Sequence, residues 1–516
     1  MNHTTTTSAG AAGAGPQAAG REAGAPGARA WASMAVLFAG TFMGLLDTTI
    51  VNVALPTIRD SLGAGEAILS WIISGYALAF GLALIPAGRL GDRYGHKWVF
   101  FAGLLLFTGA SLWCGIAGDS VQLVMARVVQ GVGGGVFFPA VTAFIQLIFP
   151  PRHRGKPFAI MGAGIGVASA LGPIVGGLII LGVGEGTGWR WIFAINVPIG
   201  VLTLVAAAVV LPRGEKGAAE GVDHLGLLLL AAGLVAVLVP LIEGQDAGWP
   251  LWTYLSLAGG LVLLTLFALW ERAFAARGRA PLVPPHLFSH LSFTGGSVLA
   301  LVYFAAFTSI FFAISLLWQV GLGHSALASG LVATPFAVGV IIGSSQSDRL
   351  AGRFGRTVLL IGTGLVATSL FTVWLILANV APLDLTSWQL LGPLLVGGLG
   401  SGLFIAPNQR FIVATVDPGE AGAASGVIGT AQRVGSAIGI AVIGSVLFGV
   451  ADLGTVGADI RAGLADGTYR SAGSASAAVL AAHVGPAAAD ALAVSAGLAV
   501  VAFALVFVLP KRISLH

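Results

Sequence analysis

Residues 88–97 read GRLGDRYGHK, a short charged and glycine-rich stretch between two long apolar runs at roughly 66–87 and 98–117. A similar stretch, DRLAGRFGR, follows at 348–356. Apolar runs of about 20 residues are long enough to cross a bilayer as helices. A charged turn that recurs between such runs predicts a bundle of membrane helices built from two related parts.

The composition of the whole chain supports this interpretation. Of 516 residues, 56% are hydrophobic and 9% are charged, whereas a soluble domain has about 25% charged residues. Fourteen apolar runs predict an all-α integral membrane protein with 14 transmembrane helices. The single cysteine, Cys114, leaves no disulfide or cysteine metal site, and His286 and His290 lack an obvious third ligand. No nucleophile–base arrangement stands out, so neither a metal nor an enzymatic activity is expected.

The basic residues predict the orientation in the membrane. An even number of spans puts both termini on one side, and that side holds nineteen of the 25 Lys and Arg residues. Cytoplasmic loops carry the excess of basic residues, so both termini are expected in the cytoplasm. This distribution also explains the net charge of +4 without a nucleic-acid partner. The excess of Arg over Lys and the 76 glycines favour a bacterial cytoplasmic (inner) membrane.

An internal repeat divides the chain. GVGGGVFFPA (131–140) resembles GLGSGLFIAP (398–407). Two related six-helix halves around a midplane site are a transporter architecture. The predicted parts are a disordered cytoplasmic tail (1–30), an N-terminal six-helix half (31–212), two inserted transmembrane helices (223–272), a cytoplasmic linker (273–291), and a C-terminal six-helix half (292–510) with an extracytoplasmic loop (451–490).

Two charges lie inside apolar runs. Asp47 is about 21 Å from the cytoplasmic end of its run, and Arg127 is about 9 Å from the outer end of another. In a hydrocarbon core about 30 Å thick these depths coincide, so the two residues are predicted to face each other across a polar cavity. Intramembrane charges mark transport pathways, which favours a proton-coupling pair over a static ion pair.

Two glycine-rich motifs are candidates for moving parts. In 88–97 the small and charged residues are spaced regularly, and a similar segment recurs at 348–356. This repetition favours a gate over an ordinary basic loop. In 162–177 the glycines give a helix a flat face for contact with its neighbours, and a proline bends it. The candidate gating residues are Gly88, Asp92, Arg93, Gly95 and Lys97, and the second motif contributes Gly172, Pro173, Gly176 and Gly177.

Several aromatic and polar residues within the apolar runs could line a substrate cavity. Aromatic rings suit flat, apolar or cationic compounds, although any one of them could equally face lipid or the protein core. The candidates are Trp71, Tyr76, Gln130, Tyr303, Phe307, Phe311, Gln432 and Arg433.

Five stretches resemble the major facilitator superfamily, and within it the 14-spanner drug:proton antiporters of the EmrB/QacA type. They are LDTTIVNVALP (46–56), GRLGDRYGHK (88–97), ARVVQGVGGG (126–135), ALGPIVGG (170–177) and GWRWIFAINVPIG (188–200). The resemblance implies a major facilitator fold, alternating access and export driven by the proton gradient without a cofactor. It implies coupling roles for Asp47 and Arg127, a gate at Asp92, and a bend at Gly172 and Pro173.

The leading hypothesis is therefore a monomeric proton-coupled antiporter that exports drug-like or antibiotic small molecules. A second hypothesis keeps the fold but makes the cargo an endogenous metabolite or lipid. A third, from another class, is a membrane scaffold or sensor that no longer transports, although intact Asp47, Arg127 and gate motifs argue against it.

Overall fold

The computed structural model describes residues 26–184, 186–213, 223–244, 247–451, 455–466, 468–469 and 471–510. The tail expected over 1–30 lies mostly outside the described residues, and the first helix already begins at Ala28. The helices are α1 (Ala28–Leu62), α2 (Glu66–Tyr94), α3 (His96–Ile116), α4 (Ser120–Ile148), α5 (Gly155–Val183), α6 (Gly188–Ala194), α7 (Asn196–Val210), α8 (His224–Glu243), α9 (Leu251–Ala276), α10 (Leu291–Leu316), α11 (Ala326–Val332), α12 (Thr334–Phe354), α13 (Thr357–Asn379), α14 (Ser387–Val413), α15 (Ala421–Ala451), α16 (Val456–Ala465) and α17 (Ala472–Leu505).

The fold is an all-helical membrane bundle, as predicted. Within the described ranges, 13 helical segments are long and apolar enough to cross a membrane, and the bent helix α5 brings the number to 14. The short helices α6 and α7 form one span, as do α11 and α12. Every backbone N–H in such helices can be bonded within the helix, which is what the bilayer interior requires.

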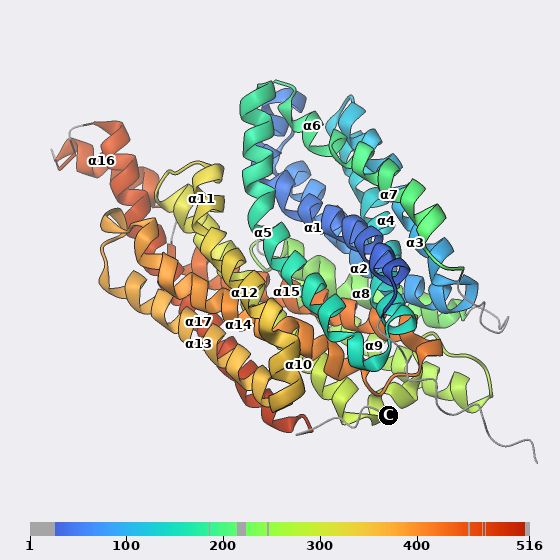
Figure 1. The fold of residues 1–516 in the computed structure, drawn as a ribbon. Helices are drawn as coiled ribbons and strands as arrows, with labels where there is room; N and C mark the ends of the chain where they lie inside the picture. Colours follow the sequence, from blue (N-terminus) through green and yellow to red (C-terminus); the bar gives the residue numbers. More distant parts are fainter. Residues whose placement is uncertain are drawn as a thin grey trace, which may run out of the picture.

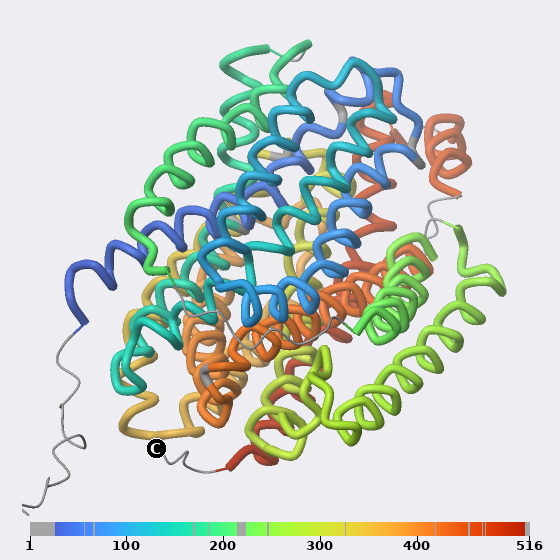
Figure 2. The backbone as a smooth tube through the Cα atoms, turned by 90° about the vertical axis from the view of Figure 1, so that its right-hand side faces the viewer, coloured from blue at the N-terminus to red at the C-terminus, as the bar shows by residue number. Residues whose placement is uncertain are grey.

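The helices pack in two similar groups (Figure 1). In one group α1 packs on α5 and α7, and α4 packs on α2 and α3. In the other group α15 packs on α10 and α17, and α14 packs on α12 and α13. Helices α8 and α9 pack on each other, and α8 also contacts α2 and α15. Figure 2 shows this pair at the edge of the molecule.

The glycine repeat recognised in the sequence is also a repeat in packing. A Cβ atom on Gly131 would collide with the carbonyl oxygen of Tyr76, and one on Gly398 would collide with that of Phe336. Glycine lets two helix backbones approach closely at these points. The contact of α4 with α2 is thereby repeated as the contact of α14 with α12.

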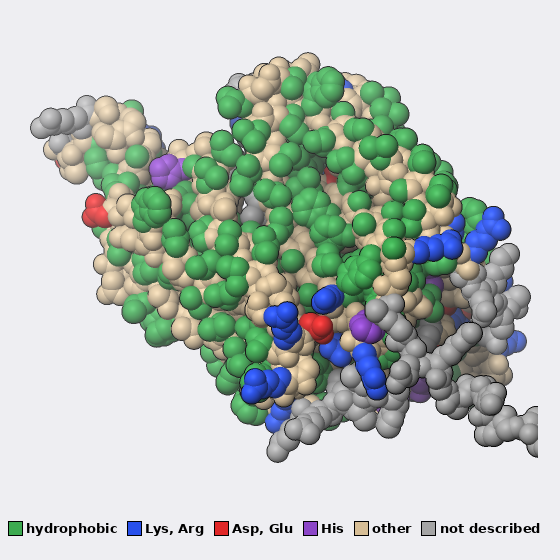
Figure 3. All heavy atoms as spheres, viewed as in Figure 1, with side chains coloured by type: hydrophobic (Ala, Val, Ile, Leu, Met, Phe, Trp, Pro, Cys, Tyr) green, Lys and Arg blue, Asp and Glu red, His purple; other side chains and the backbone are tan. Residues whose placement is uncertain are grey.

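Charged side chains are concentrated at one end of the bundle. Figure 3 shows Lys and Arg side chains at the lower end of the visible face, with hydrophobic side chains over the band above them. Helices α6 and α16 lie at the opposite, upper end, and the C-terminus lies at the lower end (Figure 1). The end with the basic residues is therefore the one expected in the cytoplasm.

The segment expected as an extracytoplasmic loop over 451–490 is largely helical where the structure describes it. Helix α16 occupies Val456–Ala465, and the last membrane helix begins at Ala472 rather than near residue 491. This segment is rich in alanine, the strongest helix former, and Ser471 caps it by accepting a hydrogen bond from the Ser474 amide. Polar residues such as His483 and Asp490 interrupt the apolar pattern without interrupting the helix.

Helix α5 joins the two groups through its glycine and proline motif. Its two parts, 151–168 and 171–183, meet at an angle of 46°, next to the proline that the sequence predicts to bend it. Side chains at Gly172 and Gly176 would meet Thr49 and Ile50 of α1. On another face, Pro173 lies beside Gly330 and Gly177 beside Leu327, both in α11. One helix turn thus packs against both groups.

Replacing Gly172 with valine is expected to destabilise the protein, because the new side chain would overlap Thr49, whose Oγ1 also donates a hydrogen bond to the Ala168 carbonyl oxygen at 3.2 Å. Overpacking of this kind costs about 1–3 kcal/mol. Thermal unfolding of the purified protein in detergent should show a melting temperature several degrees lower. Gly182→Val in the same helix is the control, since nothing lies within 4 Å of its Cβ position. Equal stability of the two variants would contradict the tight α1–α5 contact.

Candidate functional site

Asp47 of α1 and Arg127 of α4 form a buried ion pair. The Arg127 Nη1 atom lies 2.6 Å from Asp47 Oδ2, and the side chains are 0% and 1% exposed for Asp47 and Arg127 respectively. The two residues are in direct contact rather than on opposite sides of a polar cavity. Because an isolated charge at this depth costs about 2.5–3.5 kcal/mol on insertion scales, mutual neutralisation is what allows both to stay there.

Three further polar side chains complete the environment of Asp47. Asp47 Oδ1 accepts hydrogen bonds from Asn196 Nδ2 at 2.8 Å and from Gln130 Nε2 at 3.0 Å. Gln130 also donates to Ser111 Oγ at 2.6 Å. Four helices, α1, α3, α4 and α7, therefore meet at one carboxylate. Ser111 and Asn196 were missed as site residues, although Asn196, an amide inside an apolar run, was a usable signal.

The remaining contacts of Arg127 hold it in place independently of Asp47. Its Nε donates to the Ile72 carbonyl oxygen at 3.1 Å, and its Nη1 donates to Gln130 Oε1 at 2.6 Å. The guanidinium lies 4.0 Å from the centre of the Tyr76 ring, and the Tyr76 hydroxyl donates to the Gly44 carbonyl oxygen. The arginine could therefore stay in position while Asp47 changes its protonation state.

Asp92 closes the basic end of the molecule by capping a helix of the other group. Its carboxylate accepts hydrogen bonds from the backbone amides of Gly422 at 2.8 Å and Ala423 at 2.9 Å, at the start of α15. A helix N-terminus carries partial positive charge and free N–H groups, so it favours a carboxylate. Gly88 lies against Gly422, where a Cβ on either residue would collide with the carbonyl oxygen of the other.

The other residues of this motif shape the turn between α2 and α3. Gly95 has φ 93°, a left-handed conformation that favours glycine. Lys97 Nζ donates to the carbonyl oxygens of Ala208 and Leu211 at 2.7 and 2.8 Å, which ties the turn to the end of α7. Arg93 lies over the ring of Tyr94 and not against Asp92. Its contacts place it outside the α2–α15 junction.

A second acidic residue occupies the equivalent position in the other group. A Cβ on Gly155, the first residue of α5, would collide with the Asp348 carboxylate of α12, and Asp348 Oδ1 lies 3.0 Å from Arg410 Nη1. The two groups thus meet at α2–α15 and at α12–α5, each with an aspartate beside a helix start. The repeated segment DRLAGRFGR (348–356) begins with Asp348, so the sequence repeat indicated this position. Asp348 and Arg410 were nevertheless not predicted as site residues.

The aromatic candidates for a substrate cavity separate into two sets. Tyr303 is buried, stacks on Phe404 with ring centres 3.9 Å apart, and donates to Ser401 Oγ. Phe307 and Phe311 pack against this cluster and against Phe336. These rings form part of the core of the second group. Trp71, by contrast, is partly exposed, at 37%.

Two polar candidates lie on α15. Gln432 is buried and Arg433 is half-buried. The Arg433 guanidinium lies 4.1 Å from the centre of the Phe80 ring of α2, so it reaches across from one group of helices to the other. Phe80 in turn lies next to Tyr76, with ring centres 6.0 Å apart.

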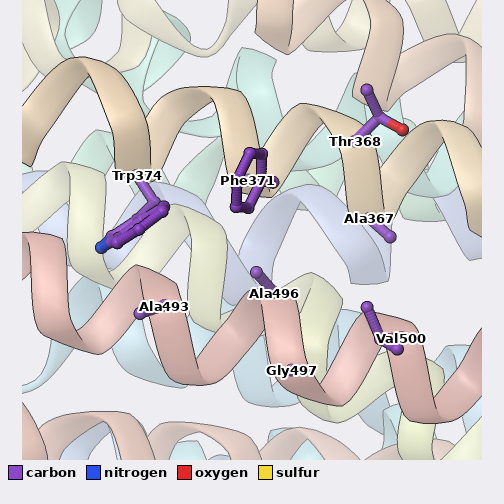
Figure 4. A pocket seen from close by; sticks show the side chains of 8 residues that line it. All are labelled: Ala367, Thr368, Phe371, Trp374, Ala493, Ala496, Gly497 and Val500. Carbon is purple, nitrogen blue, oxygen red and sulfur yellow. The ribbon is translucent and has the colours of Figure 1, made fainter.

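An open groove of about 490 Å³ lies between α13 and α17. Figure 4 shows Phe371 and Trp374 on one side of it and Ala493 and Val500 on the other. Phe371 and Val500 are more than half exposed, so the groove lies on the outer apolar surface of the bundle. None of the predicted site residues lines it.

Comparisons with known proteins fit this geometry. The sequence profile of the Major Facilitator Superfamily matches residues 37–440. A probable actinorhodin transporter of Streptomyces coelicolor is 36% identical, over 88% of this chain and 78% of its own length. The puromycin resistance protein pur8 of Streptomyces alboniger is 35% identical, over 83% and 85%. The solved structure of a proton:xylose symporter superposes with a TM-score of 0.61 at 13% identity, covering 94% of this chain and 96% of its own, and shares the fold.

Asp92→Ala is expected to open the contact at the basic end, because the α15 amides lose both hydrogen bonds to a charged acceptor. Spin labels at Trp98 and Phe354, which are 53% and 46% exposed, report the separation of the two groups by double electron–electron resonance. We expect the variant to add a population at longer distance. Arg93→Ala, which loses only the contact with Tyr94, should match the wild type. An unchanged distribution for Asp92→Ala would mean that the Gly88–Gly422 contact and the α12–α5 junction keep this end closed without Asp92.

Proposed function

The chain belongs to the Major Facilitator Superfamily and is therefore a multi-pass transporter of small molecules, and we propose that it exports antibiotic-like compounds in exchange for protons. Two relatives named for actinorhodin transport and puromycin resistance, each matching more than three quarters of both chains, support an antibiotic-like cargo. Their names favour export over uptake and over a scaffold without transport. The chain would then resemble the drug:proton antiporters that its motifs already suggested.

The observation that carries proton coupling is the carboxylate of Asp47. It is fully buried in the membrane, yet it is held by polar groups that tolerate either protonation state. Asn196 and Gln130 can hydrogen-bond a neutral carboxyl group as well as a carboxylate, and Arg127 keeps three other contacts when the charge of Asp47 is lost.

In the proposed cycle, a proton from outside neutralises Asp47 and weakens its bond to Arg127. The change would pass from α4 to α2, which packs on α4 and carries Asp92 at its cytoplasmic end. At the basic end, the Asp92 and Asp348 contacts would then release α15 and α5, so that the site faces the cytoplasm. Release of the proton into the cytoplasm and binding of cargo would complete the exchange.

The proposal also includes the setting of the protein. It places the chain in the bacterial cytoplasmic membrane as a monomer, with both termini in the cytoplasm and the proton gradient as the energy source. The basic loops at the lower end of the bundle support this orientation. No cofactor is needed for such an exchange.

Asp47→Asn is expected to abolish coupled transport, because asparagine keeps the hydrogen-bonding size but cannot take up a proton. Inverted membrane vesicles loaded with a pH-sensitive dye would measure loss of the pH gradient when puromycin or ethidium is added. The wild type should dissipate the gradient in a substrate-dependent manner, and Asp47→Asn should lose at least nine-tenths of this activity, about 1.4 kcal/mol or more of coupling. Asp60→Asn, at the exposed end of the same helix, is the matched control.

The alternatives give different results in the same assay. If Asp47→Asn transports as well as the wild type, the ion pair is structural and the coupling site lies elsewhere. If the wild type moves no member of a broad panel of antibiotics and dyes, an endogenous metabolite or lipid becomes the better cargo. If it moves none of these and also lacks any proton flux, a non-transporting role is favoured.

The orientation can be checked with single cysteines in a Cys114→Ala background. Thr187→Cys, before α6, should react with a membrane-impermeant maleimide in intact cells, because the basic-residue distribution places this loop outside. Ser289→Cys, in the exposed segment before α10, should react only after the membrane is opened. Labelling in the reverse pattern would overturn the cytoplasmic location of the termini.

A further inference from the structure

Arg433 occupies a specific place along the contact between α2 and α15. From the basic end, Gly422, Gly426 and Gly429 of α15 face α2 in turn, each against its backbone or against Leu84. Residues three or four apart share one face of a helix, so Arg433 is the next residue on this face. It is the first long side chain beyond the close glycine contact, at the depth of the membrane interior.

The two membrane-embedded arginines have opposite environments. Arg127 is fully buried and bonded to Asp47, Gln130 and the Ile72 carbonyl oxygen. Arg433 is half-buried, and across the described part of the chain it forms neither an ion pair nor a hydrogen bond; its contact is the ring of Phe80. A guanidinium is always charged and has five N–H donors, so Arg433 carries an uncompensated positive charge with all of its donors available.

A cation–π contact compensates only part of this cost. Such a contact is weaker than the cost of placing an arginine at the membrane centre. Phe80 is held rigidly as the platform, because Gly134 lies directly against its ring and Phe138 packs edge-on to it. The arginine therefore rests on a fixed aromatic ring, and part of its side chain remains exposed.

A second polar group near Arg433 also lacks a partner. Thr430, one turn earlier in α15, has a buried hydroxyl with no hydrogen-bond partner among the residues that the structure describes. A buried hydroxyl without a hydrogen-bond partner destabilises the protein. An acceptor group brought to Arg433 would satisfy donors that the protein itself leaves unused.

We propose that Arg433 is the recognition site for the anionic group of an aromatic cargo, such as a carboxylate, phenolate or enolate. This inference rests on the proposed export function and specifies its substrate class. The guanidinium fork would bind two oxygens of the anion through parallel hydrogen bonds. The cargo would approach the exposed part of Arg433, because Phe80 and Tyr76 are themselves buried, at 2% and 1% exposure. Tyr76 lies next to Phe80 and also carries Arg127 on its ring. The cargo anion would thus bind one side chain away from the proposed proton site.

The test compares two xanthene dyes with similar rings and opposite charge, anionic fluorescein and cationic tetramethylrhodamine methyl ester. Fluorescence anisotropy with the purified full-length protein measures binding without any need for proton coupling. We expect the wild type to bind fluorescein, and Arg433→Gln to weaken this binding by about tenfold or more. Arg433→Lys should lie in between, because it keeps the charge but loses the planar fork. Arg461→Gln, an exposed arginine in α16, should bind like the wild type.

Each result separates this inference from the proposed export function. If the wild type binds only the cationic dye, recognition of anions is wrong while drug export can stand. If Arg433→Gln loses the binding of both dyes or its melting transition, Arg433 supports the structure rather than the cargo. If fluorescein binding depends on Arg433 but fluorescein transport does not depend on Asp47, the anion site stands and the coupling proposal fails.

Discussion

The fold depends on one constraint, namely that a carboxylate inside a membrane must be neutralised or hydrogen-bonded. Asp47 meets this constraint by drawing in Arg127 from α4, Gln130 one turn further along the same helix, and Asn196 from the start of α7. Each of these partners fixes the rotation of its helix about its own axis, since only one face of the helix can present the polar side chain to Asp47. The first group of helices is thus organised around a polar centre, whereas the equivalent centre of the second group is a stack of aromatic rings around Tyr303. Under the proposed function, proton chemistry would belong to the first group of helices.

The two groups are joined by localised polar contacts at one end of the molecule. At the basic end they meet where the Asp92 carboxylate accepts backbone amides of α15 and where the Asp348 carboxylate sits against α5. Both junctions pair a side-chain charge with a helix start, and glycine brings the backbones close enough for the pairing. Such a contact can be released without exposing a large apolar surface, which suits a protein that has to open and close repeatedly.

The sequence was sufficient for the helix pattern, the membrane class and the meeting of Asp47 with Arg127, because long apolar runs and intramembrane charges are rare and physically costly. It was insufficient for Ser111, since a serine in a membrane helix usually bonds its own backbone and carries no distance information. Asn196 and Asp348 stood inside recognised motifs, yet their partners lie on other helices, and one sequence does not show which helices touch. The start of the last helix was misplaced for a different reason. Alanine is only weakly hydrophobic, so hydropathy placed the start near residue 491, whereas the high helix propensity of alanine extends the helix back to Ala472.

The pair formed by α8 and α9 lies on one side of the molecule, against α2 and α15. The other junction between the groups, at α5 and α12, has no such cover from this pair. The two junctions between the groups therefore differ, because among the described residues only the α2–α15 junction is covered by α8 and α9. On the α5 side the segment around Pro173 packs against α11 instead, next to Gly330. Helices α8 and α9 therefore make the two sides of a nearly twofold-symmetric protein different.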